Sequence, residues 1–157
     1  MAFDAFLKFK GINGDSARKG YEKWIEVDSF SFGVSNSSQQ SGTDGAGAGK
    51  ATFQDFTFVA RLSSATIPLV LGAASGADQG EAQLDLVKSG GKTGAAYYTI
   101  KLTNATVTRF EEGGTAGGDA DPTDVCSLAF QKIDWSYVSP SGAASRGGWD
   151  LALGKKA

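Results

Sequence analysis

Apolar and polar residues alternate along several segments of this chain, and in three long segments the alternation changes phase midway. In residues 24–34, Ile25 and Val27 share one parity, whereas Phe30 has the other. Alternation with a period of two predicts β-strands. A one-residue slip near Asp28 would keep all three side chains on one face, and a β-bulge produces such a slip while it bends the strand.

The other two long segments are residues 97–110 and 124–138. Their phase changes fall near Asn104 and between Phe130 and Ile133. A flat sheet rarely needs such slips, whereas a small and tightly curved barrel does. We therefore predict an all-β fold, a small curved antiparallel β-barrel.

Shorter runs complete the expected set of strands. Residues 5–10, 50–61, 81–88 and 149–153 contain apolar residues at strand spacing. With the long segments they give about seven or eight strands. Glycine supplies 22 of 157 residues, about twice its usual share, which fits a chain with many turns.

Residues 64–75 form the one segment that predicts a helix. Pro68 suits the first turn, Gly76 suits the position just after the end, and Ser64 or Thr66 can cap the start. The residues expected to form its apolar stripe are Leu69, Val70, Ala73 and Ala74.

Length and charge exclude several classes of protein. A chain of 157 residues fits one domain, and we assign residues 1–157 to it. The net charge of −2 offers no basic field for DNA or RNA. The chain has no apolar run long enough to cross a membrane, and its start lacks the pattern of a secretory signal. We therefore expect synthesis in the cytoplasm, no nucleic-acid partner and no membrane insertion.

The residue types of most catalytic and metal sites are missing or badly placed. The chain has no histidine, which removes the Ser-His-Asp and Cys-His systems. Cys126 alternates with apolar residues, so a buried structural thiol is expected. Asp119, Asp121 and Asp124 miss the spacing of a calcium loop, and Pro122 interrupts them. We predict no catalytic residues, no cofactor and no metal site, and thus a protein that is not an enzyme.

Five segments, in order, resemble the haemolysin co-regulated protein (Hcp) family of the bacterial type VI secretion system. They are FLKFKGINGDS at residues 6–16, WIEVDSFSFGVS at 24–35, GKATFQDFTF at 49–58, the run from PT at 122–123 into LAFQKIDWSY at 128–137, and GWDL at 148–151. Tyr21-Glu22-Lys23 is a departure that looks like a short insertion, and Phe32 stands where many relatives carry Trp.

The resemblance implies a structural role. Hcp subunits are β-barrels with one helix, and six of them close into a ring. The rings stack into a hollow tube inside a contractile sheath, and the tube carries a spike at its tip and small effectors in its lumen. The implied partners are thus other copies of the chain, the spike and sheath proteins and the effector cargo, and the type VI apparatus exports the protein.

The Ser/Gly/Gln-rich segment at residues 36–49 predicts a long exposed loop. Its length and its position between two long strands indicate a contact with a neighbouring subunit or ring. The candidate contact residues are Ser35, Gln39, Gln40, Ser41, Thr43, Asp44 and Lys50. A disordered loop without a role is the alternative.

Two other functions remain open at the level of sequence. A phage tail or a related contractile injection device uses a similar fold. A monomeric secreted β-barrel that binds carbohydrate or protein through an aromatic cleft is the less favoured alternative.

Overall fold

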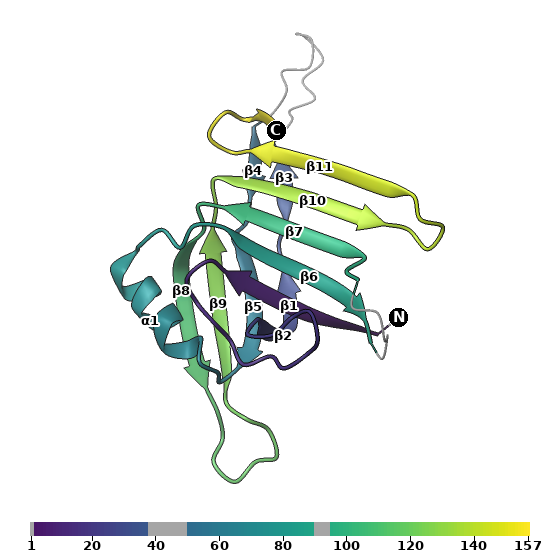
Figure 1. Cartoon of the computed structure of the whole chain (residues 1–157). Helices are drawn as coiled ribbons and strands as arrows, with labels where there is room; N and C mark the ends of the chain where they lie inside the picture. Colours follow the sequence, from purple (N-terminus) through teal and green to yellow (C-terminus); the bar gives the residue numbers. More distant parts are fainter. Residues whose placement is uncertain (1, 38–49, 90–94) are drawn as a thin grey trace.

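The computed structural model describes residues 2–37, 50–89 and 95–157, which contain twelve strands and one helix (Figure 1). The elements are β1 (Phe3–Phe9), β2 (Ile25–Ser31), β3 (Val34–Asn36), β4 (Ala51–Phe53), β5 (Phe56–Arg61), α1 (Thr66–Ser75), β6 (Ala82–Lys88), β7 (Tyr98–Thr103), β8 (Thr106–Gly113), β9 (Thr123–Ala129), β10 (Lys132–Val138), β11 (Ala144–Asp150) and β12 (Lys155–Lys156).

Ten strands form one antiparallel sheet in the order β12-β11-β10-β7-β6-β1-β2-β5-β9-β8, and β3 and β4 form a separate two-stranded ribbon. Figure 1 shows β10, β7 and β6 running at a steep angle to β5, β9 and β8, so the sheet is strongly curved. The main core fills the space between, with Leu84 and Ile100 from one half and Phe58 and Leu128 from the other.

The predicted all-β, curved fold with one helix is confirmed. In the described ranges, the sheet does not close on itself by hydrogen bonds, because β12 and β8 are its two ends. The curvature has the predicted cause within β2. There the register against β5 shifts between Val27 and Ser29, at the expected bulge.

The strand number exceeds the prediction, because the three long segments and residues 50–61 each break into two strands, and β12 was not predicted. Residues 97–110 become β7, which pairs with β6 and β10, and β8, which pairs with β9. Between them Asn104 adopts a φ of 53°, which turns the chain from one half of the sheet to the other. The change of phase therefore marks a corner here, where the chain must turn while it keeps its apolar side chains toward the core.

Helix α1 begins at Thr66, two residues later than predicted. Ala65 is its N-cap, and neither Ser64 nor Thr66 caps it. The Thr66 hydroxyl accepts a hydrogen bond from the Ser63 amide and donates one of 2.6 Å to the buried carboxylate of Asp124. Gly76 ends the helix as predicted, with a φ of 67°.

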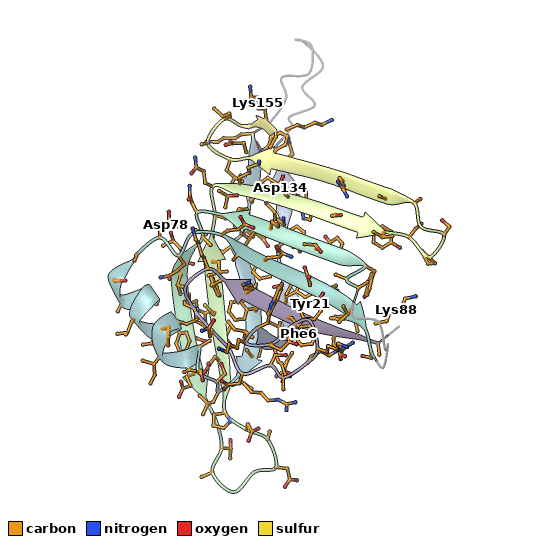
Figure 2. All side chains as sticks on the ribbon, in the orientation of Figure 1. Phe6, Tyr21, Asp78, Lys88, Asp134 and Lys155 are labelled. Atoms are coloured by element: carbon orange, nitrogen blue, oxygen red, sulfur yellow. The ribbon has the colours of Figure 1, made fainter. Side chains whose placement is uncertain are left out.

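A second small core lies on the outer face of β1 and β6. Segment 11–24 covers this face and buries Phe6, Tyr21 and Val87 together. The rings of Phe6 and Tyr21 stack with centroids 4.6 Å apart, and Figure 2 shows them side by side. The Tyr21 hydroxyl donates to the Asp85 carboxylate over 2.9 Å. Tyr21, which looked like part of an insertion, thus anchors residues 11–24 to the sheet.

Candidate assembly interface

The predicted contact loop begins and ends in the ribbon of β3 and β4. Ser35 lies in β3 and pairs with Thr52, and Lys50 is exposed immediately before β4. All three residues of β3 are exposed. The other candidates, Gln39, Gln40, Ser41, Thr43 and Asp44, lie outside the described residues. The structure thus fixes where the loop starts and returns.

Aromatic packing holds the base of this ribbon against the sheet. The ring of Phe53 lies 6.2 Å from that of Phe130, 6.4 Å from that of Trp135 and 6.4 Å from that of Trp149. The ring of Phe32 lies 6.0 Å from that of Trp135. These rings pack against the main core. They therefore orient the ribbon. A sugar-binding protein would instead need aromatic side chains that line an open cleft.

The two ends of the sheet differ in sequence and in shape. Strand β8 pairs with β9 on one side. On its other side, the only pairing in the described part of the chain is an isolated bridge between Asp78 and Thr106. At the opposite end β12 pairs with only Trp149 and Asp150 of β11. In the described part of the chain, most of both outer edges therefore has no strand partner.

Charges mark the β8 edge. Arg109 and Glu111 are both 58% exposed and form an ion pair of 2.5 Å, and Glu112 is exposed beside them. Charged side chains on an edge strand oppose indiscriminate pairing. A partner that pairs with this edge must therefore accommodate these charges.

The sequence analysis missed one surface, the outward side of α1. Ile67 and Leu71, which lie outside the predicted core-facing stripe, are large apolar side chains that are 70% and 62% exposed. Val70, which was placed in the stripe, is 40% exposed, and only Leu69 of the stripe is fully buried. The signal was present in the sequence, because TIPLVLGAAS contains no charged residue.

Catalytic chemistry has little support in the side chains. Cys126 is fully buried, and burial, with a smaller effect of the Asp124 charge, raises the pKa of its thiol to about 12. Such a thiol is a structural group. Asp124 points to Thr66, whereas Asp119 and Asp121 are exposed. Among the described residues, no group of three or more His, Cys, Asp or Glu is placed to hold a metal ion.

The comparisons with known proteins agree with one another. Residues 6–137 match the model of the family described as "Type VI secretion system effector, Hcp". The chain is 30% identical over 156 residues to protein hcp1 of Pseudomonas aeruginosa, a match that covers 96% of each protein. The chain belongs to the Hcp family.

Solved structures of Hcp proteins have the same fold. A structure described as a type six secretion system protein superposes with a TM-score of 0.90 at 28% identity, covering 99% of this chain and 100% of the other. Hcp1 of Salmonella typhimurium gives a TM-score of 0.85 at 25% identity, with both chains fully covered. As a member of the Hcp family, this chain is a type VI secretion system protein. In the part of the chain that the structure describes, no helix has the length and apolar character to cross a bilayer.

Proposed function

We propose that this Hcp protein is a structural subunit of the type VI secretion tube and has no catalytic role. Six copies close into a ring, and the rings stack into a hollow tube inside a contractile sheath. Contraction of the sheath expels the tube with the spike at its tip and effectors in its lumen. Membership of the Hcp family supports this proposal.

The observation that carries the proposal is the pair of unlike sheet edges. A ring grows through a heterologous contact, in which one surface of a subunit meets a different surface of the next. Strand β8 at one end of the sheet and β11 with β12 at the other are two such surfaces. A subunit with two unlike, incompletely paired ends fits a ring better than it fits a solitary binding protein.

The loop between β3 and β4 adds a second contact in this proposal. The ribbon is held at its base by Phe53, and Ser35 and Lys50 lie at the point where the loop leaves and returns. A loop that starts from a fixed ribbon reaches a neighbouring subunit or ring at a lower cost in entropy than one that starts from a mobile base. We therefore propose that the loop contacts a neighbouring subunit or ring.

Secretion by the bacterium that encodes this chain tests the proposal. A strain without its own copy is complemented with the wild-type chain or with a chain that lacks residues 40–47. We expect the wild-type chain in the culture medium without a cytoplasmic marker protein, and none in the medium when the sheath proteins are removed. We expect the deleted chain to fold and remain in the cells.

Two results would contradict different parts of the proposal. Release of the wild-type chain without the sheath would remove the tube function. Normal release of the chain that lacks residues 40–47, together with normal rings in electron micrographs, would leave the tube function and exclude the role of the loop.

A further inference from the structure

Residues 11–24, which we call the strap, are bonded to one another as a unit. The Gly14 amide donates to the Lys23 carbonyl over 2.8 Å. The Ser16 amide donates to the Trp24 carbonyl over 3.0 Å, and the Ser16 carbonyl accepts from the Lys23 amide over 2.8 Å. Because these backbone groups are paired within the strap, the strap keeps these hydrogen bonds when it is away from the sheet.

Side chains attach the strap to the sheet. The Tyr21 ring stacks on Phe6 of β1, as Figure 2 shows, and the Tyr21 hydroxyl donates to the Asp85 carboxylate of β6. The Arg18 guanidinium lies 5.7 Å from the centre of the Phe6 ring and pairs with the partly exposed carboxylate of Asp4. A partly exposed ion pair stabilises a protein only slightly, so Tyr21 is the main attachment.

The strap covers a small core that is distinct from the main one. This small core consists of Phe6, Tyr21 and Val87. Val87 is 1% exposed while the strap lies over it. A cavity of about 470 Å³ lies between strands β1 and β2 and the part of the strap that contains Ser16 and Arg18. The strap therefore packs on the sheet around Tyr21 and not along its whole length.

The carboxylate beneath the strap is also held by the sheet. Oδ1 of Asp85 accepts hydrogen bonds of 3.0 Å from the Gln83 amide and from the Thr99 hydroxyl. Only Oδ2 accepts the bond from Tyr21, so Asp85 keeps two of its three side-chain partners when the strap leaves. Water can then replace the Tyr21 hydroxyl. The sheet thus does not require the strap in order to hold this charge.

The strap also contacts the chain just before helix α1. The Asp15 carboxylate accepts hydrogen bonds from the amide and the hydroxyl of Ser64, over 3.0 Å and 2.5 Å. Ser64 precedes Ala65, the N-cap residue of α1. Movement of the strap therefore changes the hydrogen bonding at the start of the helix.

We propose that the strap opens as a unit while the main core stays folded, and that the hydrogen bond from Tyr21 to Asp85 is its latch. Opening uncovers an apolar patch at Phe6 and Val87, with the Asp85 carboxylate beside it. The folded chain presents this outer face of β1 and β6 only in the open form. Local openings of this kind cost less free energy than global unfolding. Strap opening is a property of the single chain, so it does not depend on the proposed function.

Thiol alkylation tests the opening, because the chain has its own reporter of global unfolding. Cys126 is the single cysteine and is buried in the main core. Val87→Cys adds a second small apolar thiol, beneath the strap. The alkylation rate of each thiol in native buffer is divided by its rate in the unfolded chain. We expect position 87 to be at least about tenfold less protected than Cys126, with a weaker dependence on urea, because local opening exposes less surface.

Two substitutions in the Val87→Cys chain separate the latch from the main core. Tyr21→Phe removes the hydroxyl and keeps the ring, and it should accelerate alkylation at position 87 about tenfold, because the lost bond is made to a charged group. Ile133→Val is the control, since Ile133 is fully buried in the main core. It should accelerate alkylation of Cys126 about fivefold and leave the rate at position 87 unchanged.

Trypsin gives a second measurement that needs no added thiol. The strap contains Arg18, Lys19 and Lys23, whereas Lys101 lies within β7. We expect cleavage in the strap at urea concentrations at which the chain stays uncut at Lys101, and faster cleavage in Tyr21→Phe.

Two results would overturn the proposed opening. One is equal protection of the two thiols with equal dependence on urea, and the other is simultaneous cleavage of the strap and of β7. An alkylation rate at position 87 that Tyr21→Phe leaves unchanged would exclude the latch. If circular dichroism shows that Val87→Cys does not fold, the cleavage by trypsin decides.

Discussion

At the scale of single residues, Gly14 lies where the chain comes closest to its own backbone. A Cβ at this position would be 2.6 Å from both Cα of Ile25 and the carbonyl oxygen of Trp24. The backbone has little room to withdraw, because the Gly14 amide donates to the Lys23 carbonyl over 2.8 Å. The turn predicted from Asn13-Gly14 thus has a further requirement for glycine that the turn signal alone did not reveal.

We predict that Gly14→Ala lowers the free energy of unfolding by about 2 kcal/mol, because overpacking against backbone atoms forces the loop to shift. Gly11→Ala is the control, since a Cβ at Gly11 would meet nothing within 4 Å. Its stability should stay within about 0.5 kcal/mol of wild type. Urea denaturation measures both variants, and equal stabilities would show that the close approach is not constraining.

The buried thiol of Cys126 makes stability depend on pH in the alkaline range. Its pKa rises from an ordinary value of 9.0 to about 12 in the folded protein. The unfolded chain therefore ionises first as the pH rises. The stabilising contribution is fully present below about pH 9 and is lost as the pH rises toward about 12.

We expect the stability difference between wild type and Cys126→Ala to be constant up to about pH 8. Above about pH 9 the advantage of wild type should fall by as much as about 1.4 kcal/mol per pH unit. Burial and the hydrogen bond to Asp85 also raise the pKa of Tyr21, but this effect is common to both chains and cancels. Urea denaturation from pH 7 to 10.5 measures the difference, and a constant value throughout would contradict the account.

At the scale of secondary structure elements, Phe53 is the aromatic side chain that holds β4 of the ribbon against the sheet. Phe53 is half-buried and contacts Phe130, Trp135 and Trp149, whereas Thr52 on the other face of β4 is exposed. The ribbon is also held by the ring of Phe32 and by pairing between two three-residue strands. Such a short pair is marginal without packing.

Phe53→Ala should therefore lower the free energy of unfolding by about 2 kcal/mol and speed hydrogen exchange at the amides of β3 and β4. Thr52→Ala should change stability by no more than about 0.5 kcal/mol and leave exchange unchanged. Denaturation and hydrogen exchange by mass spectrometry provide the two readings. If the two variants match, aromatic packing does not position the ribbon.

The elements also show what a single sequence can and cannot predict. The changes of phase near Asp28, Asn104 and Phe130 indicated a strongly curved sheet. They did not distinguish a bulge inside a strand, as in β2, from a corner between strands, as at Asn104. Periodicity is the same in both cases, because only the pairing partners differ. The helix start was placed two residues early, since Ser63 and Thr66 form local hydrogen bonds that no propensity predicts.

At the scale of the whole molecule, the surfaces proposed for assembly were only partly predictable. The segment between β3 and β4 was predicted from its composition to be a loop, and the residues on either side of it pair in the ribbon. The exposed apolar side of α1 was missed, because an apolar side chain that stays exposed has the same sequence signature as one that enters the core. The absence of charge in α1 was the available signal.

The sheet as a whole has two unlike ends, and this asymmetry suits a subunit that joins head to tail. A symmetric dimer would instead use one surface twice. The proposed tube function therefore requires a closed ring of identical chains. The mass and shape of the purified protein reveal such a ring directly.

Native mass spectrometry of the wild-type protein, with negative-stain images of the same sample, is the most direct test. We predict a species of six times the 16.2 kDa chain mass, seen as a ring with a central hole. A single chain across a wide range of concentration, with no rings in the images, would contradict it.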